Sequence, residues 1–171
     1  MRVRFGDVRD WPFMYALGKL GISDSISPWR KQPMAETLKY RESILKGFWT
    51  WIQQSGSIVF IAEASVEKGK PDLETEKTKA IGYLVLQPSS REELTGVLQG
   101  WIMDFAVLPE WRGKGAGRKL MKAAEDHCVK EGILYLGLAV SSHNVRALHL
   151  YEQSGFAEER KLMVKQLEKL E

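Results

Sequence analysis

The most regular pattern in the chain is an apolar series in the first third of the sequence. Its positions recur every three or four residues and are Met34, Leu38, Arg41, Leu45, Phe48 and Ile52. All but Arg41 are apolar. Such spacing brings side chains onto one face of a helix, so the series predicts an amphipathic helix with one charged residue in its apolar face.

Short apolar runs on both sides of that helix predict strands. The expected strands cover residues 2–8, 57–64, 80–88, 101–109, 133–140 and 156–167. The run 133–140 is almost continuously apolar and predicts a strand buried on both faces. Residues 21–33 have the composition of a loop, and the polar residues 67–79 predict an exposed hairpin loop.

Helix signals alternate with these strands. Asp10 offers a cap oxygen and Pro12 suits a first helical turn, so a short helix is expected there. Two more helices are expected over residues 114–131 and 144–153. The alternation predicts a mixed α/β domain with a strand–helix–strand crossover in its second half. A length of 171 residues suits one domain, expected to span 1–171.

Composition and charge exclude several classes of protein. Hydrophobic residues make up 44% and charged residues 27%, which argues against disorder, a collagen-like repeat and a coiled coil. The net charge of +3 is too mild for a dedicated nucleic-acid binder. No apolar run approaches the ~20 residues of a membrane span. The single cysteine, Cys128, suits a reducing compartment. We therefore expect a cytoplasmic protein with no membrane, nucleic-acid or metal partner.

The stretch EWRGKGAGRK at residues 110–119 combines glycines with positive charge where a strand gives way to a helix. Free N–H groups and the helix dipole favour an anion at a first helical turn. Gly115 and Gly117 are not followed by the residues of a P-loop, and Leu120 takes the third glycine position of a dinucleotide fingerprint. The pattern present is Arg-x-x-Gly-x-Gly, which predicts a phosphate or pyrophosphate cradle.

This turn, within FAVLPEWRGKGAGRKLM, and the later run NVRALHLYEQSGF together resemble the acetyl-CoA-binding core of the GNAT superfamily of N-acetyltransferases. The resemblance covers residues 101–157. It implies a single-domain α/β GNAT fold, a mixed central sheet with splayed strands flanked by helices. It also implies an enzyme that transfers an acetyl group from acetyl-CoA to a primary amine, by direct attack in a ternary complex.

The resemblance further implies which residues would bind acetyl-CoA. The pantetheine arm would pair with the backbone of Phe105, Ala106 and Val107, and Asn144 would contact the same arm. The pyrophosphate would lie on the turn formed by Arg112, Gly113, Lys114, Gly115, Ala116, Gly117 and Arg118. The alternatives are a solvated surface turn and, for Asn144, a plain helix N-cap.

For catalysis, the resemblance implies that Tyr151 protonates the departing CoA thiolate, with core packing as the alternative. A general base is less evident, because Trp101, Met103 and Ala139 occupy the positions where relatives carry a proton acceptor. Asp104 is the acid on the strand 101–109 and is the candidate base.

Asp104 has competing interpretations. Simple alternation turns it away from Trp101 and Met103, although a bulge could redirect it, and a structural hydrogen bond is its alternative role. Glu63, His143 and a water chain without a dedicated base remain open.

The acceptor is expected to be a small-molecule amine or a protein N-terminus. Trp29, Trp49 and Trp51 lie where the family builds its acceptor pocket, with core packing as the alternative. By the same resemblance, a homodimer could form through the segment 156–167. A regulatory module that binds acyl-CoA without turnover is the competing function.

Overall fold

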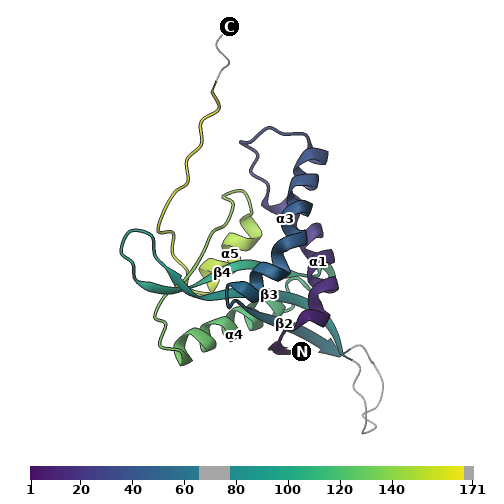
Figure 1. The fold of residues 1–171 in the computed structure, drawn as a ribbon, viewed down its shortest axis with the longest axis vertical. Coiled ribbons are helices and arrows are strands. Elements are labelled where there is room, and N and C mark those ends of the chain that lie inside the picture. The colour runs from purple at the N-terminus through teal and green to yellow at the C-terminus, as the bar shows by residue number, and fades with distance from the viewer. Residues whose placement is uncertain (66–77, 168–171) are drawn as a thin grey trace.

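A computed structural model describes residues 1–65 and 78–167, and its strands form a single five-stranded sheet (Figure 1). The strands are β1 (Arg2–Phe5), β2 (Ile58–Ser65), β3 (Thr78–Arg91), β4 (Leu98–Val107) and β5 (Leu136–Leu138). Spatial neighbours follow chain order. Strands β1 to β4 pair antiparallel, whereas β5 runs parallel to β4. The predicted hairpin loop lies outside the described residues, except for its last two, which begin β3.

The helices are distributed over the two faces of the sheet. They are α1 (Trp11–Leu20), α2 (Ile22–Ser25), α3 (Met34–Gln54), α4 (Ala116–Lys130) and α5 (Val145–Gln153). One-turn 3-10 helices at Val8–Asp10 and Pro109–Trp111 precede α1 and α4. Helix α4 is the crossover that parallel pairing of β4 and β5 requires. The short α2 falls within the predicted loop.

Each face of the sheet carries its own hydrophobic core, because strand side chains alternate between faces. On β2, Phe60 and Ala62 pack with the α4 residues Leu120 and Met121. Val59 and Ile61 point to the opposite face, where they pack with Met14 and Leu17 of α1 and Ile52 of α3. The sheet therefore lies between α4 on one side and α1 with α3 on the other (Figure 1).

The strand predicted over 156–167 is wrong, and the one predicted over 133–140 is shorter and less buried than expected. Residues 156–167 form neither helix nor strand, and they run away from the sheet in Figure 1. Among the described strands, β5 consequently pairs with β4 alone. It is three residues long and half-buried, while Leu134 and Tyr135 before it are 85% and 62% exposed. An apolar run predicts a buried strand only where neighbouring segments cover it. The homodimer through 156–167 stays a prediction.

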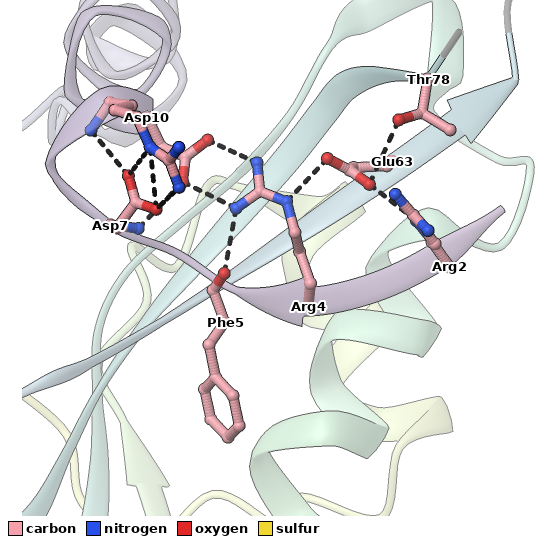
Figure 2. A network of polar contacts seen from close by, with 8 residues as sticks. Arg2, Arg4, Phe5, Asp7, Asp10, Glu63 and Thr78 are labelled. Atoms are coloured by element: carbon pink, nitrogen blue, oxygen red, sulfur yellow. Dashed lines mark hydrogen bonds and ion pairs between the residues drawn. The ribbon is translucent and has the colours of Figure 1, made fainter. Parts of the chain in front are cut away.

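The guanidinium of Arg4 joins β1 to the start of α1 (Figure 2). Its Nη1 and Nη2 lie 2.8 and 2.6 Å from the two carboxylate oxygens of Asp10, and its Nε lies 2.7 Å from Oε1 of Glu63. Arg2 donates to the other oxygen of Glu63 at 2.8 Å. Asp10 therefore makes an ion pair instead of the predicted side-chain cap of α1.

Both carboxylates titrate at lower pH because of these partners. The hydrogen bond from Arg4 lowers the pKa of Asp10 below its ordinary 3.8. Burial acts to raise the pKa of Glu63, but the hydrogen bonds from Arg4 and Arg2 outweigh it and lower the pKa below 4.5. Groups with a lowered folded-state pKa stabilise the protein above their unfolded pKa, and this contribution is lost as the pH falls through the folded-state value.

We predict that Arg4→Ala lowers the free energy of unfolding at pH 7 by about 3 kcal/mol, because it leaves two buried carboxylates without their shared partner. The wild-type advantage should disappear as the pH falls below about 4. Urea denaturation at pH 7 and at acidic pH measures both effects. Arg9→Ala is the control, since the Arg9–Asp7 pair is exposed and screened by solvent, so its loss should change the stability little. Equal loss in both variants would contradict the assignment.

Candidate active site

Strands β4 and β5 pair over only a short stretch. The paired residues of β4 are Gly100, Trp101 and Ile102, opposite the three residues of β5. Beyond Ile102, β4 continues to Val107 with β3 on one side, and none of the described strands lies on the other. The two strands therefore part in the way that the GNAT resemblance implies.

The register with β3 identifies which backbone groups face this unpaired edge. Leu108 donates its N–H to the carbonyl of Ile81 at 2.8 Å, which makes these two residues a hydrogen-bonded pair. Hydrogen-bonded and non-hydrogen-bonded pairs alternate along an antiparallel ladder, so Ala106 bonds towards β3 while Phe105 and Val107 point away from it. Of the three predicted residues, Phe105 and Val107 therefore face the open edge. The Phe105 N–H donates to Asp104 and the Val107 carbonyl accepts from Arg112, which leaves the Phe105 carbonyl and the Val107 N–H to face a ligand.

The glycine turn lies beside this edge. Gly113 and Gly115 have φ of +73° and +87°, a region that favours glycine, and α4 begins directly after Gly115. No side chain caps this helix, and its first turn contains no acid. A Cβ on Gly117 would lie 3.1 Å from Phe105 Cζ and 3.2 Å from Leu150 Cδ2. Glycine at 117 thus lets α4, β4 and α5 approach closely, with the free N–H groups of the first turn exposed to a ligand.

The predicted cations of the turn differ in their contacts. Arg112 donates through Nε to the Val107 carbonyl at 3.1 Å and so ties the turn to the end of β4. Lys114 lies over the ring of Trp111, with Nζ 5.3 Å from the ring centre. Arg118 donates to Gln153 of α5 at 2.5 Å. These contacts hold the positive charges around the first turn of α4.

Helix α5 carries the two predicted residues of the second motif. Asn144 is its N-cap, with Oδ1 accepting from the N–H of Ala147 at 3.2 Å. The Tyr151 ring packs against Phe105 and Phe156, with centroid distances of 6.4 and 5.8 Å. Burial, with a smaller effect of the Asp104 charge, raises the pKa of Tyr151 to about 12. Its hydroxyl has no hydrogen-bond partner among the described residues, so it is available to a ligand.

A bulge in β4 determines the direction of Asp104. Val85 pairs with Asp104 and the next residue of β3, Leu86, pairs with Ile102, so Met103 is an extra residue. Ile102 and Phe105 consequently both pack on the α4 core, although simple alternation would separate them. Asp104 points to the opposite face, towards α1 and α3. The bulge that the sequence left open as a way to redirect Asp104 is therefore present.

Both oxygens of the Asp104 carboxylate accept hydrogen bonds. Tyr83 Oη donates to Oδ2 at 2.8 Å, and the Phe105 N–H donates to Oδ1 at 2.9 Å. Burial raises the pKa of Asp104, although both hydrogen bonds and the charge of Arg41 act in the opposite direction. The charge of Asp104 on β4 also acts to raise the pKa of Tyr151 on α5. A raised pKa makes the Asp104 carboxylate a stronger proton acceptor than an ordinary aspartate.

The other candidate residues lie elsewhere. Glu63 is engaged by two arginines at the β1 edge, and His143 is exposed in the loop before α5. Trp51 stacks on Phe48 and Trp49 packs against Trp11, so both belong to the core on the α3 side. Trp49 lines a hollow of about 470 Å³ between β1 and the end of α3, and none of the residues predicted to bind acetyl-CoA or to act in catalysis lines it.

Tyr83 and Arg41 act on Asp104 but were not assigned to the candidate site from the sequence. Tyr83 lies in an apolar strand, where a tyrosine is equally typical of core packing. Arg41 left a signal, because it interrupts the apolar series of α3.

Other features of the described residues concern metals and membranes. Within residues 1–65 and 78–167, no group of three or more His, Cys, Asp or Glu side chains is arranged to hold a metal ion. None of the helices in these ranges combines the length and the apolar character needed to cross a bilayer.

Comparison with known proteins supports the geometry. The tetramutant of the BH1408 protein of Bacillus halodurans has a TM-score of 0.71 at 20% identity, over 98% of this chain and 100% of that one. AAC(6')-Iy in complex with the bisubstrate analogue CoA-S-monomethyl-acetylneamine has a TM-score of 0.59 at 18% identity. The match covers 98% of this chain and 97% of that one. At these identities the likeness shows a shared fold.

Sequence comparison identifies the family. An uncharacterised N-acetyltransferase of Bacillus subtilis, YhfO, is 31% identical over 126 residues, which cover 73% of each chain. The model of the acetyltransferase (GNAT) family matches residues 23–156. The chain therefore belongs to the GNAT family and is an acetyltransferase.

Proposed function

We propose that the enzyme transfers the acetyl group of acetyl-CoA to a primary amine, which is a small molecule or a protein N-terminus, by direct attack. One observation carries the proposal. The free edge of β4 beyond Ile102 adjoins the glycine turn, since Gly117 approaches Phe105 and Arg112 bonds to Val107. A strand edge and an uncapped helix start are together suited to an extended arm that ends in a pyrophosphate.

In this proposal each residue has a defined role. The open edge at Phe105 and Val107 pairs with the pantetheine arm, and the first turn of α4, from Gly115 to Arg118, binds the pyrophosphate. Asn144 retains its N-cap bond and offers its amide N–H groups to the arm. The solved complex of AAC(6')-Iy with a CoA-containing bisubstrate analogue supports the choice of ligand.

The chemistry requires two proton transfers. The neutral amine nitrogen attacks the thioester carbonyl carbon, and the C–S bond breaks as the new C–N bond forms. Asp104 accepts the proton that the attacking nitrogen loses. Tyr151 donates a proton to the departing thiolate, and its pKa of about 12 keeps the phenol protonated throughout the neutral range. Asp104 and Tyr151 then recover their resting protonation states through exchange with solvent.

The proposal is tested directly by calorimetric titration with acetyl-CoA and by thiol release in the presence of a panel of amines. We expect saturable binding and amine-dependent release of CoA. Absence of acetyl-CoA binding by the folded protein would refute it.

We predict that Gly115→Ala weakens acetyl-CoA binding by roughly tenfold or more, since a side chain at φ +87° displaces the N–H groups of the turn. Calorimetry gives the dissociation constant. The matched control is Gly47→Ala in α3, where a Cβ meets nothing within 4 Å and affinity should be unchanged. Equal affinities for Gly115→Ala and wild type would remove the turn from the binding site.

Tyr151→Phe should reduce turnover by on the order of 100-fold while the affinity for acetyl-CoA changes little, because only the proton donor is lost. Steady-state thiol release and calorimetry measure the two quantities separately. Tyr135→Phe, at an exposed tyrosine, is the control. A parallel loss of turnover and affinity would assign Tyr151 to packing.

Asp104→Asn should reduce kcat/KM for the amine by on the order of 100-fold or more and abolish the acidic limb of its pH profile. In the wild type this limb reflects protonation of a carboxyl whose pKa lies above 3.8. Measuring both enzymes with the same amine cancels the ionisation of the acceptor. Asp126→Asn, on the exposed face of α4, is the control. An unchanged profile would favour a water chain without a dedicated base.

A further inference from the structure

Arg41 is a cation in a position where the helix pattern calls for an apolar side chain. It lies one turn before Leu45 on the same face of α3. A Cβ on Gly18 of α1 would lie 3.6 Å from Leu45 Cδ2 and 3.0 Å from the Tyr83 hydroxyl, so α1, α3 and β3 meet at this point. The face of α3 that bears Arg41 therefore adjoins the hydroxyl that bonds Asp104.

The charge of Arg41 acts on this site. It lowers the pKa of both Tyr83 and Asp104, against the stronger effect of burial. Arg41 itself is exposed, so a ligand from solvent can reach it. Arg41 and Asp104 therefore lie within electrostatic range of one another, and Asp104 is the base to which the proposed function brings the acceptor amine.

The guanidinium of Arg41 makes no hydrogen bond or ion pair within the part of the chain that the structure describes. The neighbouring acid, Glu42, is engaged with α1 instead. Its Oε1 accepts from the Tyr15 hydroxyl at 2.8 Å and from Lys19 Nζ at 3.1 Å. The donors of Arg41 thus remain available, whereas both oxygens of Asp104 already accept a hydrogen bond each.

Resting on the proposed function, we propose that Arg41 binds a carboxylate of the acceptor, so that the enzyme acetylates amines that also carry a carboxylate. A guanidinium forms paired hydrogen bonds with a carboxylate in a geometry that other cations do not reproduce. An arriving ammonium group is attracted by Asp104 but repelled by Arg41. A zwitterion satisfies both charges, while a polyamine leaves Arg41 facing a second positive charge.

The test compares paired acceptors that differ only in the carboxylate. Glycine, β-alanine and 4-aminobutyrate are each assayed beside the corresponding amide, in wild type and in Arg41→Ala, by thiol release with saturating acetyl-CoA. In one of these pairs the distance between amine and carboxylate should match the site. For that pair, Arg41→Ala should lower kcat/KM for the acid by roughly 10- to 100-fold and leave kcat/KM for the amide nearly unchanged. The ratio of variant to wild type cancels differences in amine pKa between acid and amide.

Two control variants sharpen the comparison. Arg41→Lys retains the charge but loses the paired geometry, and should recover part of the activity towards the acid. Lys39→Ala removes a neighbouring exposed charge of α3 and should affect neither acceptor.

The failures are distinguishable. If amides and acids lose activity equally in Arg41→Ala, or if no acid of the panel is preferred, the inference is overturned while acetyl transfer stands. If acetyl-CoA does not bind to the wild type, the proposed function itself fails.

Discussion

Strand β4 pairs with β3 along most of its length but leaves β5 after Ile102, and the candidate site depends on this parting. The extra residue Met103 lies at the same point. A bulge bends a strand and increases its local twist, which carries the end of β4 away from the short β5. The result is an exposed backbone edge at Phe105 and Val107 and a carboxylate, Asp104, turned to the opposite face.

The two faces of the sheet supply different parts of the proposed chemistry. On the α4 face, the close approach of Gly117 to Phe105 and Leu150 sets the first turn of α4 against the open edge of β4. On the other face, Tyr83 holds Asp104 beneath α1 and α3. Donor and acceptor would therefore meet from opposite sides of one strand, which is a geometry suited to direct transfer between them.

Ion pairs at the β1 edge stabilise the face of the sheet that carries α1 and α3. The ion pairs of Arg4 connect β1 and β2 to the start of α1. Helix α1 packs in turn on Tyr83 and α3. A shift of α1 would therefore move the surroundings of Asp104 and Arg41. The Ser141 hydroxyl, in the loop before α5, donates to the Ser25 carbonyl at 2.6 Å and so links the two halves of the chain.

Local sequence signals were sufficient for features whose cause is local. The spacing of apolar residues predicted α3, and the glycine pattern predicted the turn before α4 with its positive φ values. The second motif predicted a helix over 144–153, and the structure has this helix with Asn144 as its N-cap. The bulge at Met103 was only an option, because nothing in the chain specifies which residue of a strand is left unpaired.

The sequence by itself therefore determined the periodic helices, the glycine turn before α4 and the family to which the chain belongs. The tertiary structure decided which segments became strands and which polar groups met. Residues 156–167 carry a strand-like pattern but pair with none of the described strands, and β5 is only half-buried in consequence. Tyr83 donates a hydrogen bond to Asp104, and the charge of Arg41 acts on the same carboxylate, although the three residues come from separate elements. Such contacts follow from packing and register, which the pattern of one segment cannot specify.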